Sequence, residues 1–317
     1  MHILITGGAG FLGTQLTQAL LASKDAGTAP IPFDSILSVD LTTSQVTDKR
    51  VTSAVGDITD PAFINPLINE NTVAIYHLAA VLSGGSAQNF DAAMAVNIDA
   101  TRLLLEAART QATTPRFIFT SSLAVFGGDV PDTVPATYGT QPTSTYGATK
   151  AIGELLVNEY SRKGYIHGLT CRLPTISVRP GSPNSAASSF ASGIIREPLN
   201  GLPSTCPVPH NTRMWLSSPN TIITNLLHAL TLPTDTLPTW RVLNMPGISV
   251  TVCDMLAALE DVAGQDVRAL VTDEPNQDIM DIVCSWPGAF DVSQELALGF
   301  TADTTYQDII IQHQNSV

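Results

Sequence analysis

The sequence predicts an α/β protein in which a doubly wound parallel sheet carries a smaller C-terminal lobe. Short apolar segments alternate with helical patterns, and a glycine-rich turn joins the first strand to the first helix. Of the 317 residues, 44% are hydrophobic and 14% are charged, so the chain can bury a large core. The formal charge of −13 argues against nucleic acid or an anionic membrane as a partner, since both attract clustered cations.

The expected elements follow from the spacing of apolar residues. Short apolar segments predict strands, and apolar residues at helical spacing predict helices. Strands are expected at 2–6, 36–39, 51–55, 73–77, 116–120 and 169–173, with helices at 11–22, 89–112 and 146–162. Proline and serine become frequent after about residue 173, where we expect helices at 185–198, 218–231 and 250–263 and a strand at 241–244.

The N-terminus and the cysteines indicate a cytoplasmic protein. Met1 runs directly into HILIT (2–6), without the basic segment and cleavage site of a signal peptide. No apolar run reaches the roughly 18–20 residues that span a membrane. The four cysteines are scattered without a CxxC or CxxH pattern, which favours buried thiols over disulfides or a metal site. They are Cys171, Cys206, Cys253 and Cys284.

A glycine-rich turn, TGGAGFLG (6–13), lies between the first strand and the first helix. Gly7, Gly10 and Gly13 recur at every third position, and Gly8 with the last two spells GxGxxG. Glycine accepts positive φ and lets the backbone approach a pyrophosphate, while the helix N-terminus offers free N–H groups. Because the strand and the helix are both present, the pattern predicts a Rossmann-type dinucleotide site rather than an ordinary turn.

Asp40 ends the second expected strand, where a carboxylate can accept hydrogen bonds from an adenosine ribose. Its charge would repel a 2′-phosphate, which favours NAD over NADP. The gap from Gly13 exceeds the usual spacing of about 20 residues, so a solvated loop aspartate is the alternative. Further cofactor contacts are expected at the helix start and after the third and fourth strands, from Phe11, Leu12, Asp57, Ile58, Leu78, Ala79 and Ala80.

Ser122, Tyr146 and Lys150 form a candidate catalytic set. Tyr146 and Lys150 lie four residues apart in an expected helix and therefore share a face. A tyrosine with a pKa of about 10 is a poor base at neutral pH, and an adjacent ammonium together with the positive nicotinamide ring would lower that pKa. Ser122 would hold the reacting oxygen. A Tyr four residues before a Lys is common by chance. The prediction of coupled proton and hydride transfer therefore rests on the order in which the glycine turn, Asp40, Ser122, Tyr146 and Lys150 occur along the chain.

Taken together, the motifs resemble the extended short-chain dehydrogenase/reductases, the NAD-dependent epimerase/dehydratase family. That family contains UDP-galactose epimerase and bacterial L-threonine dehydrogenase. The resemblance covers essentially the whole chain and rests on TGGAGFLG, VD (39–40), GDITD (56–60), YHLAA (76–80), TSSLAVFGG (120–128), YGATK (146–150) and RLPTISVRPG (172–181).

The resemblance implies NAD as the cofactor and Ser122, Tyr146 and Lys150 as a catalytic triad. It also implies a homodimer built on helices 89–112 and 146–162, whose alternative is burial against the sheet. We expect an NAD-binding Rossmann domain over 1–173, completed by about 217–245, and a substrate-binding lobe over 174–216 and 246–317. Asn97 matches a residue that supports the lysine through water, and Arg172, Pro174 and Thr175 match the cofactor-side loop.

The second lobe departs from the pattern of sugar-nucleotide epimerases, because RMWLSSPN (213–220) keeps an arginine but lacks two usual aspartates. Four stretches resemble the D-erythronate dehydrogenase subfamily: SGGSAQNFD, RLPTISVRPGSPN, ASSFASGIIREPLNG and SWPGAFD. This implies NAD-dependent oxidation of D-erythronate at C2, giving 2-oxo-tetronate. Arginine suits a carboxylate, although a surface or interdomain salt bridge is the alternative. Candidate substrate contacts are Ser83, Gly84, Ser86, Ser122, Tyr146, Arg179, Asn184, Ser188 and Arg213.

Three other functions stay open. A sugar-nucleotide epimerase or dehydratase would keep NAD bound and recycle it. An enzyme like L-threonine dehydrogenase would need a carboxylate near the loop to hold an ammonium, and none is evident. An NAD-binding regulator without chemistry would not need both Tyr146 and Lys150, which are present.

Overall fold

The large sheet of the protein is parallel and has seven strands. The computed structural model describes residues 1–181 and 186–316. The strand order is β10-β6-β5-β4-β1-β2-β3, so the chain reverses its direction of winding between β1 and β4, where ligands bind in such sheets. The predicted fold class is confirmed. The strands are β1 (His2–Thr6), β2 (Ser35–Asp40), β3 (Val51–Val55), β4 (Thr72–His77), β5 (Arg116–Ser122), β6 (His167–Leu173) and β10 (Val242–Asn244).

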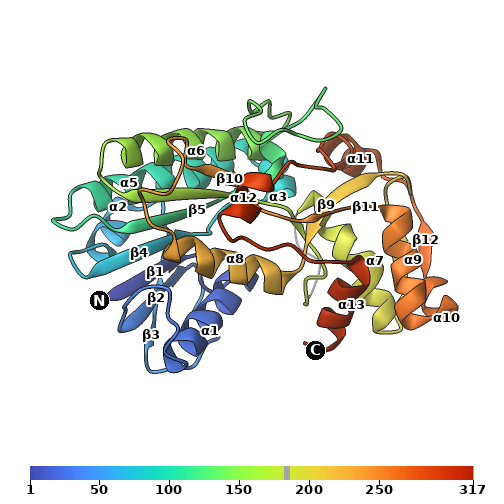
Figure 1. Cartoon of the computed structure of the whole chain (residues 1–317), viewed down its shortest axis with the longest axis horizontal. Helices are drawn as coiled ribbons and strands as arrows, with labels where there is room; N and C mark the ends of the chain where they lie inside the picture. Colours follow the sequence, from blue (N-terminus) through green and yellow to red (C-terminus); the bar gives the residue numbers. More distant parts are fainter. Residues whose placement is uncertain (182–185, 317) are drawn as a thin grey trace.

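Helices cover both faces of this sheet (Figure 1). Along β1, Ile3 and Ile5 belong to one apolar cluster and Leu4 to another, because successive side chains of a strand point to opposite faces. The first cluster packs against α1 (Phe11–Asp25) and α8 (Pro219–Thr231). The second packs against α5 (Ala100–Arg109) and α6 (Thr145–Arg162), so the central strands are buried on both faces. A short α2 (Pro61–Ile64) follows β3.

The helix expected over 89–112 is confirmed as a continuous helical run over 90–109, which contains a π-helical turn and follows a separate short helix. The chain first forms α3 (Ser83–Gln88), then α4 (Phe90–Met94), a π-helical turn (Ala95–Asp99) and finally α5. Asn97 lies in the π turn and reaches back to the loop after β4. Its side chain accepts a hydrogen bond from the Val81 N–H (2.8 Å) and donates to the Val81 carbonyl (3.1 Å).

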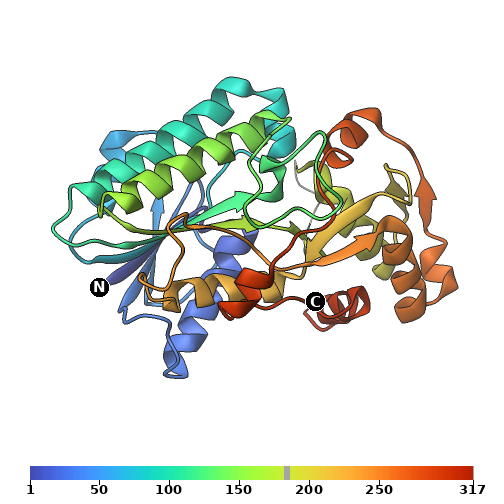
Figure 2. The same ribbon diagram turned by 45° about the horizontal axis from the view of Figure 1, so that its top comes forward.

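The C-terminal lobe contains two small sheets that the sequence did not predict (Figure 2). A three-stranded sheet has the order β11-β9-β7, and β12 pairs with β8. These strands are short, from two to five residues, and they pair across long sequence distances. No local sequence pattern therefore predicts them. They are β7 (Thr175–Ile176), β8 (Ser204–Cys206), β9 (Arg213–Ser217), β11 (Ile248–Thr251) and β12 (Val271–Asp273).

The helices of this lobe enclose a core of their own. The helices expected over 218–231 and 250–263 are present as α8 and α9, while the one expected at 185–198 is a 3-10 turn (Ala187–Ser189) followed by α7. The domain boundaries near 173, 217 and 245 stay a prediction. Across residues 1–181 and 186–316, no helix combines the length and apolarity needed to cross a membrane. The remaining helices are α7 (Phe190–Leu199), α9 (Val252–Ala263), α10 (Gln265–Arg268), α11 (Gln277–Val283), α12 (Ser293–Ala297) and α13 (Tyr306–Gln314).

Candidate active site

A cavity of about 490 Å³ lies at the carboxyl ends of the central strands. Its lining begins with the glycine turn after β1 and includes the last residues of β2, β5 and β6. Parallel strands end at the same edge of a sheet, which explains why residues far apart in sequence meet here. The cavity brings together Gly7, Gly10, Phe11, Leu12, Gly13, Asp40, Asp57, Ile58, Leu78, Ala79, Ala80, Ser83, Ser122, Tyr146, Lys150, Pro174, Thr175, Arg179 and Ser188.

Other predicted site residues lie outside this lining. Asn97 is buried behind it, and Ser86 is buried with its hydroxyl donating to the Val81 carbonyl (2.9 Å). Gly84 belongs to α3 but is not among the lining residues. Arg213 begins β9 with an exposed side chain, which donates a hydrogen bond to the Asp132 carbonyl (3.5 Å). Asn184 falls outside the described residues.

The geometry of the glycine turn fits a dinucleotide. Gly7 has a φ of +70°, and a Cβ there would lie 2.9 Å from the Ala79 nitrogen. A Cβ on Gly13 would lie only 2.2 Å from the Gly7 carbonyl oxygen, so α1 reaches the turn only because that position is glycine. Gly10 caps α1 without a side-chain hydrogen bond, which leaves the first-turn N–H groups and the positive dipole end for phosphates.

Asp40 lies beside the glycine turn at the end of β2. Its carboxylate accepts hydrogen bonds from the Ala9 N–H (3.0 Å) and the Leu41 N–H (2.7 Å). These two bonds fix the orientation of the carboxylate while leaving acceptor capacity on both oxygens. Asp40 lines the cavity next to Leu41 and Gly56, where it can accept hydrogen bonds from a ribose.

The start of α6 brings Tyr146 to the cavity beside Ser122. The Ser144 side chain caps the helix by accepting a hydrogen bond from the Gly147 N–H (3.1 Å). A Cβ on Gly147 would lie 2.0 Å from the Ala124 carbonyl oxygen, so this glycine lets α6 pack directly on the turn after β5. Lys150, one turn later, donates from Nζ to the Thr120 carbonyl (2.8 Å).

Burial controls the protonation of this pair. Desolvation raises the pKa of Tyr146 to about 12, although Ser122 and Arg179 act in the opposite direction. Desolvation also lowers the pKa of Lys150 to about 7, against the attraction of Glu154. Without cofactor the phenol is therefore not acidic, and its acidification when NAD is bound stays a prediction. At both side chains, the effect of burial on the pKa outweighs that of the neighbouring groups.

A buried ion pair joins Arg172 to Glu154 close to Lys150. The sequence analysis named Arg172 but did not identify Glu154 as part of the site. The Arg172 guanidinium donates from Nε and one terminal nitrogen to the two carboxylate oxygens of Glu154, both at 2.8 Å. The Ser121 hydroxyl also donates to Glu154 (2.6 Å). The exposed fractions are 1% for Glu154 and 5% for Arg172. The spacing could have indicated it, since Glu154 lies four residues after Lys150 on the same helical face.

Arg179 is the arginine that reaches the cavity. Its Nε is buried and has no hydrogen-bond partner among the described residues. The backbone of Arg179 is held on both sides, because its N–H donates to Ser192 Oγ (3.0 Å) and its carbonyl accepts from Arg196 (2.8 Å). Burial and the nearby Arg196 lower the pKa of Arg179. Trp286 also lines the cavity, and sequence reasoning gave it no role because nothing local links it to the site.

Comparisons with known proteins agree with this geometry. The model of the NAD dependent epimerase/dehydratase family matches residues 3–216. D-erythronate dehydrogenase from Cupriavidus necator is 46% identical over 98% of this chain and 97% of its own length, and that from Haemophilus influenzae is 45% identical over 98% of both. A nucleoside-diphosphate-sugar epimerase from Agrobacterium tumefaciens is 38% identical, with a TM-score of 0.92 over 99% of this chain and 93% of its own. The chain belongs to the NAD-dependent epimerase/dehydratase family.

Proposed function

We propose that the protein is an NAD-dependent oxidoreductase that oxidises D-erythronate at C2 to 2-oxo-tetronate. The observation that carries this proposal is the position of Arg179, which lines the same cavity as Tyr146 and whose Nε has no hydrogen-bond partner among the described residues. A guanidinium with free donors suits a carboxylate, and a tyrosine beside it suits removal of a hydroxyl proton. Two relatives that match nearly the whole chain are D-erythronate dehydrogenases.

The cofactor proposal rests on the glycine turn and Asp40. The turn would hold the pyrophosphate against the start of α1, and Asp40 would accept hydrogen bonds from the adenosine ribose. The carboxylate would disfavour a 2′-phosphate, which supports NAD over NADP. When bound, NAD supplies the hydride acceptor for the carbon that carries the substrate hydroxyl.

Tyr146 would remove the proton from the substrate hydroxyl while Ser122 holds the oxygen. The phenol has to lose its own proton first, and burial opposes this. Arg179 and Ser122 already favour the phenolate, and any positive charge brought into the cavity lowers the pKa of Tyr146 further. Lys150, fixed on the Thr120 carbonyl, would contact the cofactor ribose and contribute charge when protonated.

A sugar-nucleotide epimerase is the second candidate, because the Agrobacterium relative carries that name and is 38% identical. The charges of the cavity disfavour it. Among the described lining residues, only Lys150 and Arg179 are cationic, and Lys150 is engaged with a backbone carbonyl. One available arginine fits a single carboxylate better than a diphosphate, which usually meets several donors.

The decisive experiment offers the protein C3 to C6 sugar acids with NAD and with NADP and follows formation of the reduced cofactor. We expect net reduction of NAD with D-erythronate above all other acids, and weaker reduction of NADP. A parallel assay offers UDP-sugars and analyses them for epimers. Epimer formation without net cofactor reduction on any sugar acid would replace the proposal with the epimerase.

We also propose a homodimer formed through α4 and α6. Phe90 on α4 and Leu155 on α6 are each 59% exposed, and Ile152 lies on the same helix with 38% exposure. Large apolar side chains grouped on neighbouring helices are typical of an interface. Light scattering should give twice the chain mass, and Leu155→Glu should shift it towards a monomer. A wild-type monomer at micromolar concentration would contradict the dimer.

A further inference from the structure

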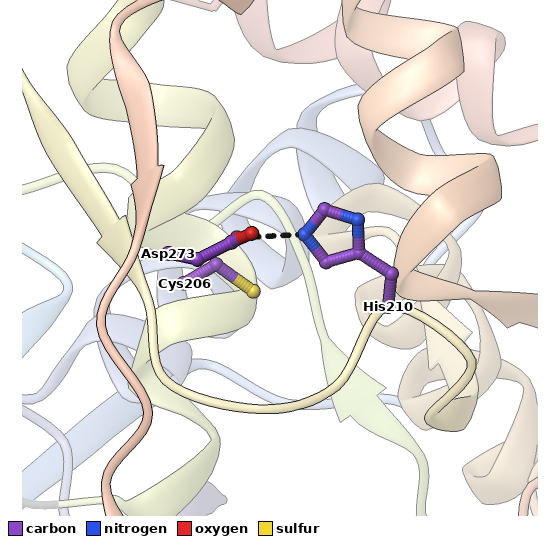
Figure 3. Close-up of side chains that lie close together, drawn as sticks. All are labelled: Cys206, His210 and Asp273. Carbon is purple, nitrogen blue, oxygen red and sulfur yellow. Dashed lines mark hydrogen bonds and ion pairs between the residues drawn. The ribbon is translucent and has the colours of Figure 1, made fainter.

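A second group of reactive side chains lies in the two-stranded sheet of the C-terminal lobe. Cys206 ends β8 and Asp273 ends β12, and the two residues are direct partners in the parallel register. His210 comes from the loop that follows β8. Figure 3 shows the sulfur, a carboxylate oxygen and one imidazole nitrogen directed toward a common point. None of the three is among the residues found to line the active-site cavity.

The distances within this cluster suit a shared ligand. His210 Nε2 lies 2.7 Å from Asp273 Oδ1, and the donor atoms of all three residues lie within 4.8 Å of one another. Cys206 is 1% exposed, whereas the side chains of His210 and Asp273 are 36% and 64% exposed. The sulfur therefore forms the floor of the cluster, and the imidazole and carboxylate form its open side.

Backbone hydrogen bonds hold the three residues in this arrangement. The His210 carbonyl accepts from the Cys253 N–H (2.8 Å) at the start of α9, which anchors the loop. The Cys206 carbonyl accepts from the Glu274 N–H (3.0 Å), which extends the pairing of β8 with β12 beyond Asp273. The cluster is thus built on paired strands and an anchored loop, and rigid elements hold ligands more reliably than free side chains.

The same residue types could form a nucleophilic triad, but the geometry disfavours it. In such a triad one imidazole nitrogen meets the thiol and the other meets the carboxylate. Here the nitrogen that bonds to Asp273 is the one facing the sulfur, and the other points away (Figure 3).

We propose that Cys206 Sγ, His210 Nε2 and a carboxylate oxygen of Asp273 bind one Zn²⁺ ion, with water as the fourth ligand. Sulfur, imidazole and carboxylate together select a borderline cation such as zinc over magnesium or calcium. Bonds of about 2.0–2.3 Å in a tetrahedron place donor atoms roughly 3.3–3.8 Å apart. The exposed His210 and Asp273 can move to meet this spacing around the fixed sulfur.

The ion would have a structural role. It would replace the hydrogen bond between His210 and Asp273 and displace the thiol proton of Cys206. It would thereby tie the ends of β8 and β12 to the loop that carries His210. Because α7 leads directly into β8, the ion would also restrain the lobe that carries the Arg196 contact to Arg179.

The test uses tag-free, metal-stripped full-length protein titrated with Co²⁺ as a spectroscopic probe and with Zn²⁺ as a competitor. We expect one equivalent of Co²⁺ to bind, with a thiolate-to-cobalt charge-transfer band and the intense visible bands of four-coordination. Zn²⁺ should displace the cobalt and raise the melting temperature. Absence of stoichiometric binding, or binding without the charge-transfer band, would overturn the proposal.

Variants assign the ligands. Cys206→Ser should abolish the charge-transfer band, whereas Cys284→Ser, which alters an exposed thiol, should leave it unchanged. His210→Gln and Asp273→Asn change half-exposed or exposed positions, so they should fold normally and weaken binding by at least about tenfold each. If both of these variants bind cobalt as tightly as the wild type, the ion is not held by this cluster.

Discussion

The cavity edge of the large sheet and the sheets of the C-terminal lobe use charged side chains in opposite ways. Under the cavity, Lys150, Glu154 and Arg172 are almost fully buried, and each is held by a short hydrogen bond. In the second lobe, Arg213 and Asp273 are exposed. Buried charges fix geometry because any displacement leaves a desolvated charge without a partner. The rate of the proposed oxidation should therefore depend far more on the residues at the cavity edge than on those in the sheets of the C-terminal lobe.

The largest expected effect is that of Tyr146→Phe. The substitution removes the proposed proton acceptor while keeping the ring that packs at the start of α6. We expect kcat on D-erythronate to fall by about 10²–10⁴-fold, with the affinity for NAD nearly unchanged. Steady-state kinetics and a binding titration on the same preparation measure both quantities. A variant with near-normal kcat would remove Tyr146 from the mechanism.

A large loss of stability is expected from Glu154→Gln. Arg172 would then keep its buried charge without the carboxylate that pairs with it, at a cost of about 3–5 kcal/mol in unfolding free energy. The matched control is Glu159→Gln on the same helix, since Glu159 pairs with Arg162 in solvent and should change stability very little. Urea unfolding of both variants measures the difference. Equal losses would mean that burial does not distinguish the two pairs.

The sequence could predict the first region because its signals are local. The turn that contains Gly7 and Gly13 lies between a strand and a helix that are each recognisable alone, and the carboxyl ends of parallel strands then meet by topology. The cavity accordingly gathers residues as distant as Asp40, Ser122 and Tyr146. Their spacing did not reveal the sign of the pKa shift of Tyr146, because desolvation depends on the packed surroundings.

The second region could not be predicted to the same extent because its contacts are non-local. The strands β8 and β12 have three residues each and pair across more than sixty positions, so neither has a recognisable period. Cys206 and Asp273 become neighbours only through that pairing. For the same reason, the sequence offered Arg179 and Arg213 as equal candidates, and only the fold brings Arg179 to the cavity.

The two arginines give a direct test of the comparison. Arg179→Gln should raise the KM for the sugar acid by about tenfold to a hundredfold, because a charge-assisted hydrogen bond to the carboxylate is lost. Arg213→Gln should leave KM within about twofold of the wild type, since that side chain is exposed outside the cavity. Initial rates across a range of D-erythronate concentrations measure both. A larger effect at Arg213 would place the carboxylate at β9, outside the cavity that Arg179 lines.

The smallest expected effect is a dependence of stability on pH that comes from Lys150. Its folded pKa of about 7 lies below the model-compound value of 10.5. Between these two pH values the unfolded chain binds more protons than the folded one. The contribution of Lys150 to the free energy of unfolding therefore rises with pH. Relative to Lys150→Met, the wild type should gain about 2 kcal/mol in unfolding free energy between about pH 7 and about pH 9.

Urea unfolding of both proteins at each pH measures this gain, and subtracting the variant removes the contributions of all other titrating groups. The direction is the informative result, because a lysine stabilised by an ion pair would show the opposite trend and lose stability at high pH. A difference that falls with pH would mean that Glu154 outweighs burial at Lys150. Lys150 would then be fully charged at neutral pH, and its ammonium could favour the Tyr146 phenolate as the sequence first suggested.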